Sequence, residues 1–434
     1  SEMRTKTGNT LLLIVSYVVL AYENALSCIL LAYVTIVTFV GGKHITRCLL
    51  PLYATLTVAI IPLTIYKYYD FACSILTDVG LLCKSHSLII PIGISFFTLQ
   101  AIGYIIDVYR GKIKAENNLL DYTLFLSLFP QIVAGPISRY SQLMPQIKNN
   151  RTFSAQRATE GLRMLLWGVF LKIVIADRLS LYVNDIVNYI DVADGSSLLS
   201  MAFFYSFQIY SDFAGYSLMA IGTAKVVGFD LPDNFRRPYL SVSITEFWRR
   251  WHISLSLWLR DYIYISLGGN RCSRWRNYVN ITTTFLVSGI WHGANYTFLI
   301  WGLLHGMFQC IEKVLGLNKE YAGNKLLKAI RIATTFIIVT MLWIVFRMPT
   351  LSDAWTVFVH IATTTDFHLV MPEKYVIILL AIAIIKDLVD EYHPQYDMLH
   401  HRSLMVRWTS YVLIAMSIIL FGVFDSGQFI YAKF

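Results

Sequence analysis

Hydrophobic residues gather in long stretches along the chain. The clearest stretches cover residues 88–108, 198–222, 279–301, 329–347 and 409–424. A helix needs about 20 mainly apolar residues to span the hydrocarbon core of a bilayer, and several of these stretches approach or exceed that length. The pattern therefore predicts an all-α, polytopic membrane protein with about eleven transmembrane or re-entrant helices.

Polar residues and helix breakers interrupt other apolar stretches. An early run is divided at Glu23 and Asn24, which predicts two short helices instead of one. Residues 120–137 contain Pro130 and Pro136 within an apolar stretch. Such residues are tolerated at membrane depth only where protein or a water-filled cavity satisfies the freed backbone groups, so we expect a broken or re-entrant segment there.

Residues 279–311 form an apolar stretch that is too short for two straight spans. Basic loops flank it at residues 225–276 and 312–331, and such loops tend to stay on the cytoplasmic side. A bent or hairpin arrangement would return the chain to that side. Four glycines provide positions for the bend: Gly289, Gly293, Gly302 and Gly306.

The charge of the remaining loops completes the predicted orientation. Residues 139–163 are basic and are expected in the cytoplasm, whereas residues 177–196 and 349–373 lean acidic and are expected outside, together with the C-terminus. Only 15% of all residues are charged, compared with about 25% in soluble domains. The net charge of +9 therefore reflects the basic loops, and we expect no nucleic-acid partner.

The six cysteines are scattered, without a CxxC pair or the spacing of a metal site. We therefore expect neither a disulfide framework nor a zinc site. The first apolar run starts near Thr10 behind a short polar, basic lead, so we expect no cleavable signal peptide.

The segment EFWRRWHISLSLWLRDY, residues 246–262, combines aromatic and basic residues. Ser243 followed by Glu246 is a capping-box signature, which predicts a helix from about Ile244. Residues 234–276 hold eight arginines and two acidic residues. Arginine without lysine favours geometric pairing with carboxylates, phosphates or aromatic faces over bulk charge.

Helical periodicity places Trp248, Trp251 and His252 on one apolar face of this helix, opposite most of the charged residues. We expect a basic amphipathic helix at the cytoplasmic interface, with its tryptophans at the level of the lipid headgroups. A histidine on such a face is either a satisfied interior residue or a functional group, and the spacing alone leaves both open. The arginines of the segment, Arg249, Arg250 and Arg260, either anchor the helix to anionic lipid or attract a phosphate-bearing acyl donor.

Two histidines, His292 and His305, lie within an apolar stretch. Ionisable residues at membrane depth are costly and usually face an interior cavity, which favours a functional role for His292. On a regular helix, His292 shares a polar face with Ser288, Asn295 and Tyr296, whereas His305 lies on another side and is expected to pack or hydrogen-bond. A buried neutral imidazole can take a proton from a hydroxyl group as its oxygen attacks an acyl carbon.

Asp212 also lies at membrane depth, where we expect either a structural ion pair with an arginine or a role in orienting a histidine. The chain lacks the GxSxG serine elbow of hydrolases. This disfavours a covalent serine enzyme and favours direct transfer from a bound thioester.

Three blocks resemble the membrane-bound O-acyltransferase family: DFAGYSLMAIG (212–222), PDNFRRPYLSVSITEFWRRWHISLSLWLRDYIYISLGGNR (232–271) and SGIWHGANYTFLIWGLLHG (288–306). The resemblance extends over nearly the whole chain. LGGNR and WHGANYTF are similar to the alginate O-acetyltransferase branch. DFAGYSL, with Leu218, is more similar to the D-alanyl transfer protein of teichoic acid synthesis.

The resemblance implies one membrane domain over residues 1–434, with its histidine-bearing core at about 200–310 and its helices ringing a central tunnel. It also implies a multi-pass protein of the bacterial cytoplasmic membrane. His292 matches the catalytic histidine of the family, and His252 matches a second functional histidine of the bacterial branches. The segment with Trp248 and Trp251 would then line the cytoplasmic mouth of the tunnel.

By the same resemblance, we expect acetyl transfer from a thioester donor, acetyl-CoA or an acyl carrier, to hydroxyl groups of an exported polysaccharide. His292 would act as general base, His252 would assist proton transfer or position the donor, and Asn295 would steady an oxyanion. An extracytoplasmic acetyltransferase or export-complex subunit is the expected partner, besides membrane lipid. No metal or permanently bound cofactor is expected.

Three alternatives remain at this point. The first is D-alanyl transfer to teichoic acid, and the second is a non-catalytic scaffold in an export complex. The third is a transporter of a glycan precursor, although transporters commonly contain inverted repeats and paired broken helices. A single histidine-bearing block without a counterpart argues against this third alternative.

Overall fold

The computed structural model describes residues 2–45, 48–132, 135–319, 321, 323–364 and 368–424. Within these ranges, every regular element is a helix. The chain divides into two compact units. The first contains the residues up to Leu162 together with Ala220–Asp233, and the second contains Arg163–Met219 and the chain from Asn234 onward.

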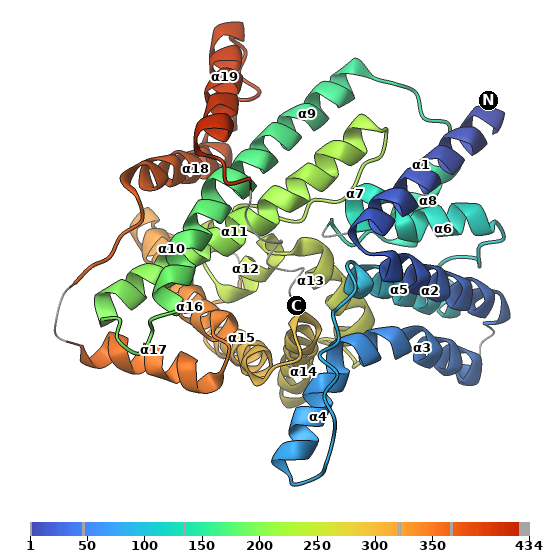
Figure 1. Ribbon diagram of the computed structural model, residues 1–434, viewed down its shortest axis with the longest axis horizontal. Helices are drawn as coiled ribbons and strands as arrows, with labels where there is room; N and C mark the ends of the chain where they lie inside the picture. Colours follow the sequence, from blue (N-terminus) through green and yellow to red (C-terminus); the bar gives the residue numbers. More distant parts are fainter. Residues whose placement is uncertain are drawn as a thin grey trace. The chain divides into compact units, whose positions relative to one another are not determined.

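The first unit holds the N-terminal helices (Figure 1). They are α1 (Glu2–Glu23), α2 (Ala25–His44), α3 (Leu49–Leu63), the π-helical turn η1 (Thr64–Tyr68), α4 (Tyr69–Asp78), α5 (Ile94–Tyr109), α6 (Leu119–Ser127), α7 (Phe129–Ile132) and α8 (Tyr140–Lys148). The helices α9 (Ala155–Val169) and α11 (Gly195–Val226) contribute residues to both units.

Both helix breaks predicted in this part of the chain are confirmed. The side chain of Asn24 accepts a hydrogen bond from the Leu26 backbone amide and caps α2, so the chain starts a new helix directly after Glu23. Likewise, α6 ends at Ser127, and α7 forms only one turn around Pro130. Proline lacks the amide hydrogen that a continuous helix requires, which is the physical reason for the second break.

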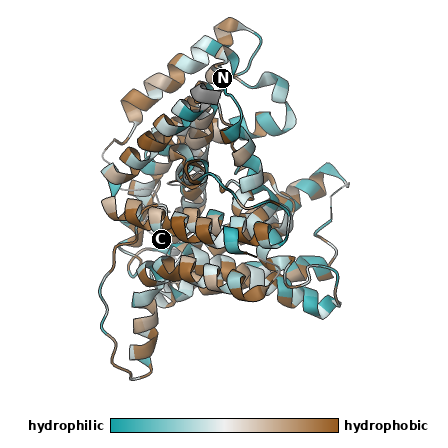
Figure 2. Ribbon diagram, turned by 90° about the vertical axis from the view of Figure 1, so that its right-hand side faces the viewer, coloured by the Kyte–Doolittle hydropathy of each residue, from teal (hydrophilic) through white to brown (hydrophobic). Residues whose placement is uncertain are grey.

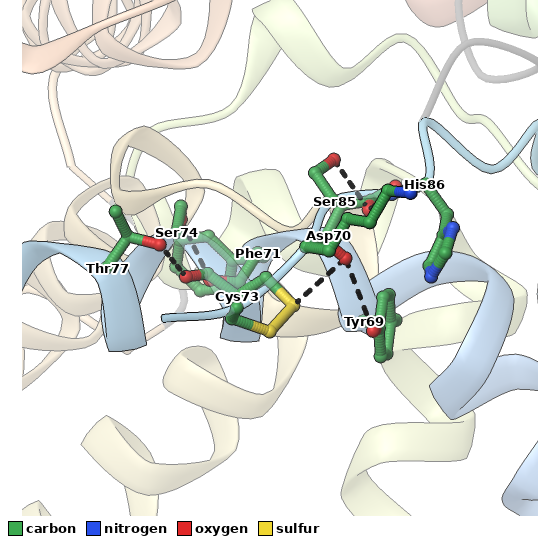
Figure 3. The surroundings of a disulfide bond; sticks show 10 residues. Tyr69, Asp70, Phe71, Cys73, Ser74, Thr77, Ser85 and His86 are labelled. Atoms are coloured by element: carbon green, nitrogen blue, oxygen red, sulfur yellow. Dashed lines mark hydrogen bonds between the residues drawn. A yellow bond between two sulfur atoms is a disulfide. The ribbon is translucent and has the colours of Figure 1, made fainter. Parts of the chain in front are cut away.

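One disulfide bond joins Cys73 of α4 to Cys83, with the two Cα atoms 5.1 Å apart (Figure 3). No disulfide framework was expected from the scattered cysteines, and this single bond was not predicted. The chain folds back after α4, and the Asp70 carboxylate accepts hydrogen bonds from the Ser85 hydroxyl and the His86 backbone amide, each at 2.8 Å. This fold-back brings the two sulfur atoms together, and their spacing in the sequence carries no signal of it.

The second unit holds the remaining helices. They are the π-helical turn η2 (Phe170–Ala176), α10 (Asp177–Val187), η3 (Pro238–Leu240), α12 (Ile244–Arg250), α13 (Ile253–Leu259), η4 (Arg260–Tyr264), α14 (Arg274–His292), α15 (Tyr296–Val314), α16 (Lys325–Arg347), α17 (Leu351–Thr363), α18 (Lys374–Tyr392), η5 (Pro394–Tyr396) and α19 (Leu404–Phe421).

The hairpin predicted from the glycines is formed by α14 and α15, which lie side by side (Figure 1). At the crossing, Gly289 faces the carbonyl oxygen of Phe298, and Gly302 faces that of Phe285. A Cβ atom at either glycine would collide with the facing carbonyl oxygen. Glycine therefore allows the two backbones to approach closely, as small residues do between membrane helices.

Four of the described helices are long and apolar enough to cross a membrane: Ala25–His44, Leu49–Asp78, Lys325–Arg347 and Leu404–Phe421. Figure 2 shows hydrophobic residues along much of the helical ribbon. The prediction of an all-α, polytopic membrane protein is thus confirmed, and the count of about eleven spans stays a prediction.

Candidate active site

The segment that carries His252 begins as its sequence predicts. The hydroxyl group of Ser243 accepts a hydrogen bond from the Glu246 backbone amide at 3.0 Å, and the carboxylate of Glu246 accepts one from the Val242 amide at 2.9 Å. These bonds cap the first turn of α12, which starts at Ile244. The predicted helix start is confirmed.

One continuous amphipathic helix, however, was a wrong prediction. Helix α12 ends at Arg250, and α13 begins at Ile253. Between them, His252 adopts a left-handed backbone conformation, with φ 43° and ψ 54°. The Ile253 amide donates its hydrogen bond to the backbone carbonyl of Asn234, at 2.9 Å, instead of to a carbonyl of α12. A partner that is distant in the sequence therefore breaks the helix.

The tryptophans of this segment do not lie at a surface. Trp248, Trp251 and Trp258 retain only 5%, 0% and 6% of their exposure, so the prediction of headgroup contact is wrong. Trp251 stacks on Phe247 at a ring distance of 5.4 Å and contacts Trp343 at 5.0 Å. The break after α12 places these large rings in the interior, where aromatic burial stabilises the fold.

His252 is fully buried. Its Nδ1 atom lies 3.1 Å from Oδ1 of Asn234. Its ring meets Phe213 edge-on at 4.6 Å and contacts Trp291 at 5.8 Å. The imidazole is thus fixed by a polar group on one side and by aromatic rings on the others.

His292, the last residue of α14, lies in an aromatic cage. It retains 1% of its exposure. Its ring contacts Trp291 and Trp301 at 5.0 Å each and Phe346 at 5.4 Å. Because Trp291 contacts both His292 and His252, the structure brings the two predicted catalytic histidines into one cluster of rings.

His305 lies on α15, not on the helix of His292. Its Nδ1 atom accepts a hydrogen bond from the indole nitrogen of Trp248 at 3.1 Å. Its ring also contacts Trp301 at 4.8 Å, and Trp301 contacts His292. The structure therefore links the two histidines of the apolar stretch through one tryptophan, although their positions on a regular helix suggested that they are unrelated.

The polar strip predicted along one helix is interrupted. Because α14 ends at His292, Ser288 shares its helix but Asn295 and Tyr296 do not. Asn295 instead caps α15 by accepting from the Thr297 amide at 3.1 Å. Its amide nitrogen donates to the carbonyl of Pro349 at 2.7 Å. The second N–H of this amide nitrogen is the donor that stabilising an oxyanion would use.

Asp212 lies on α11 and retains 1% of its exposure. The ammonium group of Lys172 lies 2.6 Å from the Asp212 carboxylate and 2.7 Å from that of Asp177. Pairing with an opposite charge offsets the free-energy cost of removing a carboxylate from water. An ion pair was expected here, and the structure supplies a lysine where the sequence analysis expected an arginine.

The predicted arginines line two adjoining cavities. Arg249 and Arg260 border a cavity of about 320 Å³, together with Trp248, Phe285 and Lys313. A second cavity, of about 430 Å³, is bordered by Arg249, Arg250 and three further cations, Arg236, Lys319 and Lys328, with Glu246 as its acidic residue. Arg249 belongs to both cavities, so the apolar rings of the first adjoin the positive charge of the second.

Two of these arginines have carboxylate partners. Arg250 lies 2.7 Å from Glu246 and 2.9 Å from Glu391. Arg260 lies 2.7 Å from Asp261, and the hydrogen bond to this carboxylate raises the pKa of the Arg260 guanidinium above its ordinary value. Both groups therefore stay charged, while Arg249 is an exposed residue that borders both cavities.

Three residues of this region were not predicted from the sequence. Asn234 accepts a hydrogen bond from the Ser254 amide just after the break at His252, and Lys172 forms an ion pair with Asp212. The Glu312 carboxylate accepts hydrogen bonds from the Ile244 and Thr245 amides at the start of α12. Their partners are distant in the sequence, so helical periodicity carries no signal for them. Among the described residues, no group of three or more His, Cys, Asp or Glu side chains could hold a metal ion.

Comparison with known proteins identifies the family of the chain. The model of the membrane-bound O-acyltransferase family, MBOAT, matches residues 113–348. The chain is 41% identical over 363 residues to the probable alginate O-acetylase AlgI of Pseudomonas aeruginosa, covering 81% of this chain and 69% of that protein.

Two further relatives carry other names. The peptidoglycan O-acetyltransferase of Helicobacter pylori is 38% identical over 322 residues, which cover 67% of this chain and 60% of that protein. The teichoic acid D-alanyltransferase of Bacillus subtilis is 29% identical over 266 residues, which cover 58% of this chain and 67% of that protein. The family model and these relatives show that the chain belongs to the membrane-bound O-acyltransferase family and is an O-acyltransferase.

Proposed function

We propose that this protein transfers an acetyl group from a cytoplasmic thioester donor to hydroxyl groups of an exported polysaccharide. The observation that carries the proposal is the pair of buried histidines, His252 and His292, which share the ring of Trp291. The similarity to an alginate O-acetylase and a peptidoglycan O-acetyltransferase supports acetyl as the transferred group. The protein acts as one multi-pass domain of the bacterial cytoplasmic membrane, with about eleven helices around a tunnel.

His292 is the general base in this proposal. Its imidazole takes the proton of the acceptor hydroxyl as the oxygen attacks the thioester carbonyl carbon. The carbon–sulfur bond then breaks, and the proton passes to the departing thiolate, so the ester and the free thiol are the products. The neutral imidazole is the form that accepts a proton. His252, which contacts the same indole ring, assists this proton transfer.

The two cavities beside α12 suit the donor. Five cations border the cavity of about 430 Å³, and phosphate groups are the ligands that arginine forks bind best. The adjoining cavity of about 320 Å³ offers Trp248 and Phe285 to an apolar or extended arm. Acetyl-CoA and the phosphopantetheine arm of a carrier share this chemistry, so either fits the proposal.

D-alanyl transfer to teichoic acid is the second candidate. A relative with that name shares 29% of its aligned residues with this chain, compared with 41% for the alginate relative. The reacting groups of both reactions are an acyl thioester and a hydroxyl, so the two histidines serve either. The identities favour acetyl, and we expect an extracytoplasmic partner to complete the delivery to the polymer.

Mass spectrometry of ester-linked acyl groups on surface polymers tests the proposal. Cells with the normal protein are compared with cells that carry His292→Ala, and with His368→Ala as a control at an exposed histidine of the same unit. Loss of acetyl esters only in His292→Ala supports the proposal and identifies the acceptor. Loss of D-alanyl esters supports the second candidate. Unchanged esters, with the variant inserted in the membrane, contradict catalysis by His292.

A further inference from the structure

A buried asparagine holds the break that carries His252. Asn234 retains 1% of its exposure and lies in the loop before η3. Its side-chain oxygen accepts from the backbone amide of Ser254 at 3.2 Å and from the Ser254 hydroxyl at 2.9 Å. Its side-chain nitrogen donates to the hydroxyl of Ser217 at 3.0 Å, and its backbone carbonyl accepts from Ile253. Every polar group of the side chain is thus engaged.

These bonds decide which end of the amide faces His252. A backbone amide can only donate, so the Asn234 atom that faces the Ser254 amide is the oxygen. The same oxygen lies 3.1 Å from Nδ1 of His252. Since a carbonyl oxygen can only accept, Nδ1 must carry the proton of the neutral imidazole, and Nε2 carries the lone pair.

The backbone conformation of His252 also indicates a role for Asn234. A left-handed conformation at φ 43° is uncommon for any residue with a Cβ atom. The two residues that follow His252 are both bonded to Asn234, Ile253 through its backbone and Ser254 through its backbone and hydroxyl. Conformations of this kind persist where the surrounding structure determines them, and they concentrate at functional sites.

We propose that Asn234 is a positioning residue, which fixes the tautomer and the orientation of His252 and thereby makes Nε2 its proton acceptor. The ring of His252 is then held between Asn234 and the aromatic rings of Phe213 and Trp291. Its Nδ1 nitrogen takes no part in proton exchange, because its hydrogen bond to Asn234 is retained throughout. This inference rests on the proposed catalytic role of His252.

Nitrogen-15 NMR of protein with labelled histidines tests the tautomer directly. The two ring nitrogens of a neutral imidazole have different shifts with and without the proton, and the His252→Gln variant assigns the signal. We expect the proton on Nδ1 in the normal protein and in Asn234→Asp, whose carboxylate keeps the acceptor. Asn234→Leu removes the acceptor and should mix or reverse the tautomers.

Steady-state kinetics with acetyl-CoA as the donor provides the second readout. We expect Asn234→Leu to lower kcat by about 10- to 100-fold, the range that loss of an orienting partner of histidine produces at metal sites. The KM of the donor should change by less than about twofold, because uniform binding is retained. Asn234→Asp should recover most of kcat. Asn280→Leu is the matched control, since Asn280 is equally buried in the same unit and donates to the Gly269 carbonyl.

Each outcome decides the inference. A proton on Nε2 of His252 in the normal protein overturns it, as does an Asn234→Leu variant with unchanged tautomer and unchanged kcat. If Asn234→Leu fails to fold, the spectra of the normal protein and of Asn234→Asp still decide. If His252→Gln is fully active while the proton lies on Nδ1, the catalytic role of His252 fails and the assignment of Asn234 stands.

Discussion

The two histidines of the cluster are held in different ways. His252 lies in a break between two short helices, where hydrogen bonds to Asn234 fix its ring and the adjoining backbone. His292 lies at the end of a long helix, where aromatic rings surround it and glycines press α14 against α15. The hydrogen bond to Asn234 determines the tautomer of His252. The rings around His292 determine the position of its imidazole and exclude water from it. The comparison indicates that the two residues have separate tasks.

The largest expected effect follows from replacing His292. Removing a general base typically costs about 10²- to 10⁴-fold in rate, so His292→Ala should lower kcat for acetyl transfer by about 10³-fold. His252→Gln should cost less, because an assisting residue leaves the base in place. Transfer by the purified protein is measured with radiolabelled donor. Equal losses in both variants would contradict the separation of their tasks.

A larger side chain at the crossing of α14 and α15 should lower the stability of the fold that positions His292. Gly302→Leu places a side chain against the Phe285 carbonyl, and overpacking of this kind costs about 1–3 kcal/mol or more. Thermal unfolding in detergent, followed by size-exclusion chromatography, measures the loss. Leu303→Ile is the control, a volume-conserving change at a partly exposed position of the same helix. Equal stability of Gly302→Leu and the normal protein would show that the close crossing is dispensable.

The backbone difference between the two sites can be tested with one pair of substitutions. At His252, asparagine tolerates the left-handed conformation better than alanine, so His252→Asn should be more stable than His252→Ala by about 1 kcal/mol. At His292, which is helical, alanine should instead be more stable than asparagine by about 0.5 kcal/mol. The same order of stability at both positions would argue against this backbone difference in solution.

A separate effect is expected on binding of the donor. Arg249→Ala removes a cation from both cavities, and the KM of acetyl-CoA should rise by about tenfold, as expected for one hydrogen bond to a charged group. Its kcat should stay within about twofold of normal. Arg276→Ala, at an exposed arginine of α14, should leave both constants unchanged. A fall in kcat at constant KM would move Arg249 from donor binding to the chemical step.

The two regions also differ in how much of them the sequence predicts. Local signals predict the start of α12 at Ser243 and the hairpin of α14 and α15, because caps and close helix crossings depend on neighbouring residue types. The break at His252 depends on Asn234, and periodicity alone favours a continuous helix there. The burial of Trp251 also depends on this break. Trp251 follows the last residue of α12, Arg250, and is buried there instead of lying on the surface of a continuous helix.

The charged residues show the same limit. Asp212 is visible in the sequence as a costly charge at membrane depth, but the sequence does not identify Lys172 as its partner. The catalytic assignment of His292 came from the resemblance of its block to a known family. The features predicted from local pattern are therefore those whose partners lie in the same helix or in the next helix along the chain.

The disulfide bond gives the membrane topology a chemical marker. Such bonds persist in oxidising compartments and are rare in the cytosol. We therefore predict that the end of α4 and Cys83 lie on the outer side of the membrane. The basic residues Arg110 and Lys112, which follow α5, are predicted on the cytoplasmic side. Whether a thiol reagent that cannot cross the bilayer reaches Cys73 and Cys83 after reduction thus reports the sidedness of the first unit, independently of any count of charges.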